Sequence, residues 1–248
     1  MDNSKTAYFA HRGANFDLPE NTVFSIKHMI EKGIDGIEVD VRLTQDGQVI
    51  LSHDPDFKRT AGIAKKICDM SLEEIKKINV AHYLKKFTSP IFVAKLEEVL
   101  DICKMHNLRC SIELKPEEDF SLIDKVYDII KATKTQPLVQ IYSFNLEMVK
   151  EFSRKNPPFP LHLNLEVDPM PYLKIAMENR WGLNPRFDLV SKVFVEACKE
   201  NNISVHTWTV NNREMKKLLT CWGVKAIISD DLHTEPQGVG KAIYAHKR

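Results

Sequence analysis

The chain lacks the features that would assign it to several specialised classes of protein. Among its 248 residues, 35 Lys and Arg oppose 34 Asp and Glu, so the net charge is only +1 and a basic footprint for nucleic acid is missing. No apolar run approaches the ~18 residues of a membrane helix, and the polar start of the chain lacks the apolar core of a signal peptide. We therefore expect a cytoplasmic protein with no nucleic-acid partner and no integral membrane segment; its oligomeric state stays open.

Cysteine pairs and the common catalytic motifs are missing too. The five cysteines are scattered and form no Cys-x-x-Cys, which favours reduced thiols in the core. No Gly-x-Gly-x-x-Gly follows the first expected strand, and the sequence contains no P-loop, no Gly-x-Ser-x-Gly and no His-x-His. These absences weigh against a dinucleotide-binding sheet, a serine hydrolase of the elbow type and a binuclear zinc hydrolase.

What the chain does have is a regular alternation of short apolar runs and segments of helical period. We expect strands at 8–10, 37–41, 110–114, 139–142, 161–167, 204–210 and 226–229, with a weak one near Leu183. Between them we expect helices at 96–106, 122–132, 146–154, 173–178, 189–199 and 213–220, and one from an Asn21 N-cap to Gly33. Eight parallel strands with helical crossovers predict an α/β fold, a closed (β/α)8 TIM barrel, with an open doubly wound sheet as the competitor.

One stretch interrupts this alternation. Asp46-Gly47 is a strong signal for a two-residue type I′ turn, so residues 41–53 should form an antiparallel hairpin that sets Asp40 opposite His53. Residues 55–94 contain one capped helix, with Ser71 and Glu74 as its capping box, and little else regular. We interpret 55–94 as an insertion within a single domain of residues 1–248.

Acidic side chains recur at alternate positions on two of the expected strands. Glu38 and Asp40 point to the same side of their strand, and two close carboxylates in a barrel interior are costly without a cation or a shared proton. Glu113 and Lys115 repeat the pattern on the next barrel strand. Three converging carboxylates make an oxygen-rich site suited to Mg²⁺ or Ca²⁺. Lys115 and Arg12 add the positive charge that an anionic oxygen requires.

The residues around these side chains resemble a known family. The matching runs are Ala10-His11-Arg12-Gly13-Ala14, Pro19-Glu20-Asn21-Thr22, 33–41, 44–47, His53-Asp54, 112–115, Ser143-Phe144, 208–211 and 223–230. In this order, and over nearly the whole chain, they resemble the glycerophosphodiester phosphodiesterase family. The resemblance implies a metal-dependent (β/α)8 barrel that hydrolyses a small-molecule glycerophosphodiester to glycerol 3-phosphate and an alcohol.

The resemblance also implies a role for each matching residue. His11 and His53 look like the acid-base pair, and Arg12 and Lys115 look like phosphate contacts. The metal ligands would be Glu38, Asp40 and Glu113, holding a divalent cation such as Mg²⁺ or Ca²⁺. Further substrate-binding residues would be Glu20, Asn21, Phe144 and Trp208, although Asn21 also suits a helix cap.

Two alternatives to this function stay open. A related enzyme could act as a lysophospholipase D on lipid phosphodiesters, with the same site and a different mouth for the headgroup. The second alternative belongs to another class of function, in which the barrel has lost catalysis and only binds its ligand. The attacking oxygen could belong to water or to the glycerol hydroxyl of the substrate itself, and the second route would give a cyclic phosphate.

Overall fold

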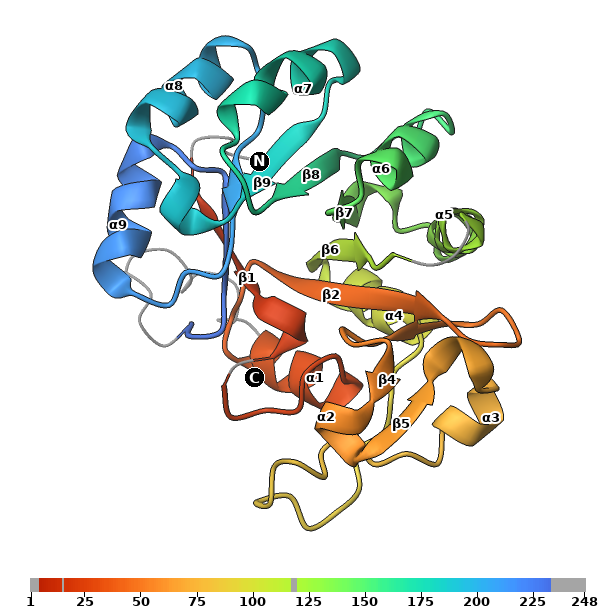
Figure 1. The fold of residues 1–248 in the computed structure, drawn as a ribbon. Helices are drawn as coiled ribbons and strands as arrows, with labels where there is room; N and C mark the ends of the chain where they lie inside the picture. The colour runs from red at the N-terminus through yellow and green to blue at the C-terminus, as the bar shows by residue number, and fades with distance from the viewer. Residues whose placement is uncertain (1–4, 15, 117–119, 233–248) are drawn as a thin grey trace, which may run out of the picture.

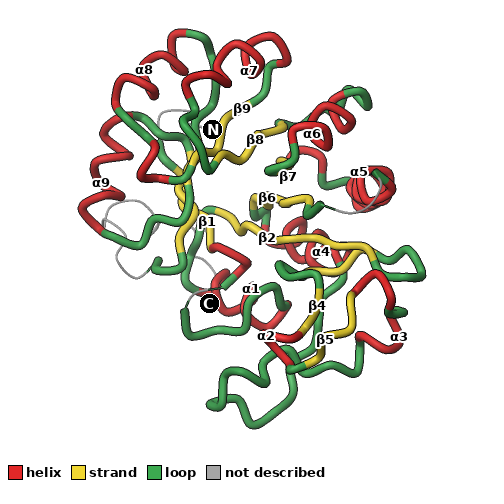
Figure 2. Tube along the Cα trace, viewed as in Figure 1, coloured by secondary structure: helices red, strands yellow, loops and turns green. Residues whose placement is uncertain are grey.

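Eight parallel strands form a nearly closed ring, with helices on its outer face (Figures 1 and 2). The computed structural model describes residues 5–14, 16–116 and 120–232. The sheet order is β10-β11-β1-β2-β6-β7-β8-β9, and bridges from Leu183 to Val205 and from Arg186 to Trp208 connect its two ends. The strands are β1 (Ala7–Ala10), β2 (Gly36–Leu43), β6 (Arg109–Leu114), β7 (Val139–Ser143), β8 (Leu161–Leu165), β9 (Gly182–Pro185), β10 (His206–Thr207) and β11 (Ala226–Ser229). The predicted (β/α)8 barrel is thus confirmed.

The outer helices bury one face each against the strands. In α4, the buried side chains are Leu96, Val99, Leu100 and Cys103, the three-and-four spacing of an amphipathic helix. Side-chain oxygens of Asn145, Ser191 and Asn212 cap three other helices. The helices are α1 (Val23–Glu31), α4 (Leu96–His106), α5 (Ser121–Thr133), α6 (Leu146–Ser153), α7 (Leu173–Asn179), α8 (Lys192–Glu200) and α9 (Arg213–Trp222).

The first helix begins one residue later than predicted. Thr22, and not Asn21, is its N-cap, since the Thr22 hydroxyl accepts a hydrogen bond from the Ser25 N–H at 3.2 Å. Asn21 has a φ of +56°, so its backbone is in the left-handed region outside the helix. Gly33, with a φ of +76°, follows the end of the helix as predicted.

The hairpin after β2 forms, but the predicted type I′ turn is wrong. At its tip only Gly47 has a positive φ, of +72°, whereas a type I′ turn needs two such residues. The Thr44 N–H donates to the Gln48 carbonyl, and the Gly47 N–H donates to the Thr44 carbonyl. The loop therefore has three residues, as in hairpins that combine a tight turn with one left-handed residue.

The longer loop shifts the register by one residue. Strand β3 (Val49–Leu51) pairs antiparallel with β2, and the Asp40 carbonyl accepts the Ser52 N–H at 3.0 Å. The predicted pairing of Asp40 with His53 is wrong. His53 lies beyond β3, in the segment that leads into the insertion.

Residues 55–94 contain more regular structure than predicted. Besides α3 (Leu72–Ile75), whose Ser71–Glu74 capping box is confirmed, they form β4 (Asp56–Phe57), α2 (Lys58–Ala61) and β5 (Ile63–Lys66). Together with Ile50 of β3, their apolar side chains build a separate cluster made of Phe57, Ile67, Met70, Ile75, Ile78 and Val80. This segment, orange to yellow in Figure 1, lies beside β2 and α1. A single domain of residues 1–248 stays a prediction, because residues 1–4 and 233–248 lie outside the described part.

The structure tests the expectations of buried thiols and of no membrane-spanning helix. All five cysteines are free, but only Cys103, Cys110 and Cys198 are buried, so Cys68 and Cys221 are not the core thiols we predicted. Within the described residues, no helix combines the length and the apolar character needed to cross a membrane.

Two buried histidines fill part of the barrel interior. The rings of His162 and His206 stack with their centroids 4.0 Å apart, and the Tyr142 hydroxyl forms a hydrogen bond with His206 Nδ1. Gly182 makes room for the His162 ring, because a Cβ there would lie 2.1 Å from its Cδ2. Neither ring nitrogen of His162 has a hydrogen-bond partner within the described residues. Burial therefore lowers the pKa of His162 to about 3.

This neutral imidazole should make the fold acid-sensitive. An unfolded histidine binds a proton below its ordinary pKa of 6.5, whereas folded His162 stays neutral down to about 3, so acid favours unfolding across this window. The loss is about 1 kcal/mol of unfolding free energy per pH unit. Urea titrations from about pH 7 to pH 4 should show a shallower loss for His162→Leu than for the wild type. His106→Leu, at an exposed position, is the matched control for the substitution itself. Equal slopes for all three proteins would contradict a buried neutral His162.

Candidate active site

The residues singled out from the sequence come together at the carboxyl end of the barrel strands, the end where barrel enzymes carry their sites. Strands and the turns directly after them supply most of these side chains. They are His11 and Arg12 after β1, Glu38 and Asp40 on β2, Glu113 on β6, Lys115 after it, Phe144 after β7 and Trp208 after β10. Glu20 and Asn21 precede α1, and His53 follows β3.

Three buried carboxyl groups form the centre of the site. Asp40 on β2 is the register partner of Glu113 on β6, and Glu38 lies two residues before Asp40 on the same face. One oxygen from each of the three lies within 4.8 Å of the others. Glu38 Oε1 is buried, yet it has no hydrogen-bond partner in the described part of the chain. The free oxygen and the all-carboxylate donor set fit a hard divalent cation.

The electrostatics of this cluster favour an additional cation. Lys115 Nζ lies 2.7 Å from Asp40 Oδ1 and also contacts Glu113. Although burial opposes it, the Lys115 charge keeps the pKa of Asp40 below its usual range. Burial and the charge of Asp40 raise the pKa of Glu113, and they raise the pKa of Glu38 to about 8. One lysine thus leaves part of the carboxylate charge uncompensated.

Arg12 lies beside the carboxylates with one donor unused. Its backbone adopts a left-handed φ of +53°, which lets the N–H donate to Glu38 Oε2 at 2.9 Å. The guanidinium donates to Glu20 at 2.9 Å, and its Nε lies 3.8 Å from Asp40 Oδ2. That buried Nε makes no hydrogen bond with any described residue. A guanidinium held in this way can bind a phosphate oxygen.

Asn21 contacts Asp40 at two points. Its side-chain N–H donates to Asp40 Oδ2 at 2.9 Å, and the Asp40 backbone N–H donates to Asn21 Oδ1 at 3.1 Å. The left-handed backbone of Asn21 turns the amide toward the barrel, away from the helix that it was expected to cap. Asn21 as a whole residue is 3% exposed. Asn21 therefore fixes the position of one carboxylate of the cluster.

Each of the two candidate catalytic histidines bonds to a carboxylate through Nδ1. His11 Nδ1 lies 2.6 Å from Asp230 Oδ1, and His53 Nδ1 lies 2.8 Å from Asp54 Oδ1. Because an ionised carboxylate only accepts hydrogen bonds, Nδ1 carries the proton in a neutral ring and Nε2 has the lone pair. The sequence-based prediction includes no role for either aspartate. Asp54 follows His53 directly, but Asp230 is 219 residues from His11, a distance at which local pattern gives no signal.

The two histidines differ in electrostatic surroundings. Burial lowers the pKa of both, but at His11 the bond to Asp230 and nearby negative charge outweigh it, so the pKa lies above 6.5. At His53 the charge of Asp40 offsets burial only in part, and the pKa lies below 6.5. Imidazoles can act as general acids or general bases, so this pair could exchange protons with a substrate in either direction.

The two predicted aromatic residues lie against one another on the other side of the barrel mouth. Phe144 and Trp208 pack edge to face with their ring centroids 5.3 Å apart. The Trp208 indole N–H donates to the Asn184 carbonyl at 3.0 Å. The Asn184 side chain donates to Asn164 at 2.8 Å, which in turn donates to Glu113 at 3.2 Å. A continuous polar path thus connects the aromatic pair to the carboxylate cluster.

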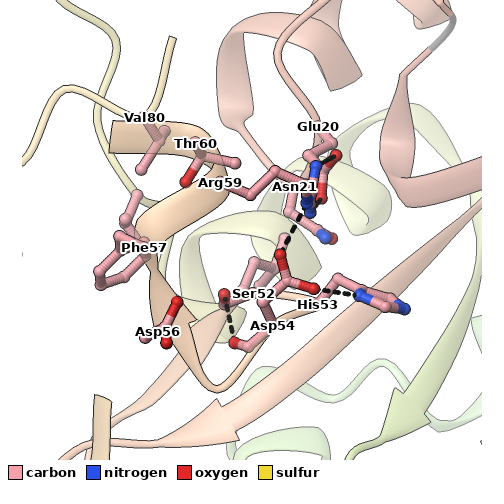
Figure 3. A pocket seen from close by; sticks show the side chains of 12 residues that line it. Glu20, Asn21, Ser52, His53, Asp54, Asp56, Phe57, Arg59, Thr60 and Val80 are labelled. Atoms are coloured by element: carbon pink, nitrogen blue, oxygen red, sulfur yellow. Dashed lines mark hydrogen bonds and ion pairs between the residues drawn. The ribbon is translucent and has the colours of Figure 1, made fainter. Parts of the chain in front are cut away.

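A small cavity of about 20 Å³, enough for one water molecule, lies between the barrel mouth and the inserted segment (Figure 3). Its lining is Glu20, Asn21, Leu51, Ser52, His53, Asp54, Asp56, Phe57, Arg59, Thr60, Val80 and Val93. Arg59 reaches from α2 toward Glu20 and Asp54 in this view. We did not predict a role for Arg59 from the sequence.

Known sequences resemble this chain over most of its length. The model of the Glycerophosphoryl diester phosphodiesterase family matches residues 11–234. A glycerophosphodiester phosphodiesterase from Caldanaerobacter subterraneus subsp. tengcongensis is 31% identical over 236 residues, or 93% of this chain and 96% of that protein. A protein of the same name from Bacillus altitudinis is 30% identical over 231 residues, or 91% of this chain and 94% of that protein.

Solved structures share the fold. A phosphodiesterase from Oleispira antarctica, in complex with the product sn-glycerol-3-phosphate, superposes with a TM-score of 0.85 at 24% identity, covering 91% of this chain and 93% of that one. A glycerophosphodiester phosphodiesterase from Agrobacterium tumefaciens strain C58 has a TM-score of 0.80 at 21% identity, covering 91% and 96%. These likenesses support the barrel assignment independently of the sequence pattern.

The contacts of Asn21 predict a specific order of stabilities. Asn21→Ala removes both bonds to Asp40 and leaves a Cβ at a left-handed φ, so it should lose about 2–4 kcal/mol of unfolding free energy. Asn21→Gly tolerates that φ and should lose about 1 kcal/mol less. The capping residue gives the control, since Thr22→Ala should cost about 1 kcal/mol. Urea denaturation measures all three. A loss for Asn21→Ala no larger than for Thr22→Ala would contradict the role given to the Asp40 contact.

Proposed function

The chain belongs to the glycerophosphoryl diester phosphodiesterase family, and on that premise we propose that it hydrolyses glycerophosphodiesters to glycerol 3-phosphate and an alcohol with a bound divalent cation. The predicted enzyme class, a phosphoric diester hydrolase, agrees with this membership. The observation that supports hydrolysis with a bound cation is the buried carboxylate cluster beside two histidine–aspartate pairs. The product bound to the relative from Oleispira antarctica supports the substrate class.

Residues at the barrel mouth would hold the cation and the phosphate. Glu38, Asp40 and Glu113 would bind Mg²⁺ or Ca²⁺, which when bound would offset negative charge on the phosphate. Arg12 would donate its unused Nε–H to a nonbridging phosphate oxygen. The Lys115 ammonium would contribute positive charge next to the same phosphate.

The histidine pair would move the protons of the reaction. A bond forms between the attacking oxygen and phosphorus, while the bond from phosphorus to the alcohol oxygen breaks. One imidazole accepts the proton of the attacking hydroxyl, and the other donates a proton to the leaving oxygen. In this scheme Asp54 and Asp230 hold the rings of His53 and His11 so that Nε2 faces the substrate.

The contacts of the other predicted substrate-binding residues suggest two different roles. Phe144 and Trp208 would form an apolar wall for the glycerol or the alcohol group. Glu20 and Asn21 have Arg12 and Asp40 as partners. We therefore propose that these two position catalytic groups and do not themselves contact the substrate.

Removing the cation should abolish turnover. We expect the protein to release glycerol 3-phosphate from at least one of glycerophosphocholine, glycerophosphoethanolamine and glycerophosphoglycerol. This activity should be lost after exhaustive chelation and restored by Mg²⁺ or Ca²⁺, because the carboxylate cluster needs a counter-charge. The measurement is a product assay with and without chelator, with lysophosphatidylcholine as a fourth substrate. Full activity after chelation would contradict the metal requirement, and cleavage of lysophosphatidylcholine alone would favour a lysophospholipase D.

Each histidine should be needed for turnover but not for folding. His11→Ala and His53→Ala should each lower kcat by about 10²–10⁴, the usual contribution of a general acid or base. Both side chains lie at the barrel mouth and belong to neither apolar cluster, so the melting temperatures should stay close to that of the wild type. Steady-state kinetics and thermal unfolding test both points. Near-normal kcat in either variant would rule out the proposed proton transfer for that residue.

A further inference from the structure

Arg59, on α2 of the inserted segment, binds two carboxylates at once. Its Nε donates to Asp54 Oδ2 at 2.7 Å. Its two terminal nitrogens donate to the two oxygens of Glu20, each at 2.7 Å, in a forked pair. Figure 3 shows the guanidinium reaching across the cavity between them. No other kind of side chain has the planar array of donors that this arrangement requires.

Both carboxylates bound by Arg59 also bind a proposed catalytic residue. Glu20 Oε1 accepts a hydrogen bond from Arg12 Nη1 at 2.9 Å. Asp54 Oδ1 lies 2.8 Å from His53 Nδ1. A path of alternating charge therefore runs from Arg12 through Glu20, Arg59 and Asp54 to His53. One end would bind the phosphate and the other would move a proton, while Arg59 lies at the centre.

We propose that Arg59 is a positioning residue of the active site, through which the inserted segment fixes both Arg12 and His53; this rests on the function proposed above. Without the Arg59 guanidinium, Arg12 would be the one cation that pairs with Glu20 among the described residues. The full charge of Glu20 would then draw Arg12 away from the phosphate. Asp54 would lose the bond that orients it and could rotate away from the His53 ring. Both effects follow from contacts that Arg59 makes to carboxylates, with no contact to the substrate.

Loss of these ion pairs alone should leave the inserted segment folded. The Arg59 side chain is 44% exposed and therefore partly screened by solvent, while its partners Glu20 and Asp54 are 16% and 27% exposed. The apolar cluster around Phe57 and Ile75 holds the segment in place independently of Arg59. Lys65 provides a matched control in the same segment, since it pairs with Glu74 at 2.9 Å and both side chains are 47% exposed.

The test is a set of double-mutant cycles around Arg59. Arg59→Gln should lower kcat/KM by about 10²-fold, the cost of misplacing catalytic groups by about 1 Å, while Lys65→Gln should leave it unchanged. Arg59→Lys should recover only part of the loss, because one ammonium cannot fork across Glu20 and reach Asp54. In Asp54→Asn or Glu20→Gln backgrounds, adding Arg59→Gln should cost much less than it does in the wild type.

A measurement that needs no turnover separates this proposal from the proposed function. Nitrogen NMR of the imidazoles without substrate should show His53 protonated at Nδ1 in the wild type and as a tautomer mixture in Arg59→Gln. A wild type without phosphodiesterase activity would overturn the proposed function, and the NMR result would still decide the role of Arg59. An unchanged His53 tautomer in Arg59→Gln would overturn the positioning role. So would double variants whose loss of kcat/KM equals the product of the two single losses.

Discussion

Three buried carboxyl groups repel one another at the mouth of the barrel, and the surrounding residues are arranged to compensate that repulsion. Lys115 supplies a full positive charge, Asn21 an amide N–H, and Arg12 both a backbone N–H and a guanidinium. Lys115, Asn21 and the Arg12 backbone N–H each donate to an oxygen of the cluster, while the Arg12 guanidinium lies 3.8 Å from Asp40 without a hydrogen bond to it. The carboxylate cluster is compatible with a divalent cation, and under the proposed function the donors around it would be preorganised for that ion and for a phosphate beside it.

The site divides its chemistry between strands and loops. The carboxylates lie on β2 and β6, where the register of neighbouring strands sets the distance between Asp40 and Glu113. The histidines lie in segments after β1 and β3, where no strand pairing fixes the ring. Each ring instead has an aspartate, and each aspartate is held in turn: Asn211 donates to Asp230 at 3.0 Å, as Arg59 does to Asp54.

Features that depend on local spacing could be predicted from the sequence, and features that depend on distant partners could not. Alternation along β2 was enough to place Glu38 and Asp40 on one face, and the repeat of the pattern on β6 made Glu113 a candidate for the same cluster. The hairpin register was missed because Asp46-Gly47 is compatible with two loop lengths, and contacts of Asp46 with Thr44 and Leu72 accompany the longer one. The family resemblance named Asn21 as a candidate site residue, but its bonds to Asp40, 19 residues away, had no signal in the local pattern.

The inserted segment and the loop that carries His53 belong to one packed unit. Ile50 on β3 is part of the apolar cluster of that segment and not of the main barrel core. The Leu72 N–H donates to Asp46 at 3.1 Å, which ties α3 to the tip of the hairpin. The position of His53 relative to Asp40 therefore depends on how this unit docks on β2. Because the barrel core has its own larger apolar cluster, a change in this docking would move one proposed proton-transfer group and leave the carboxylates in place.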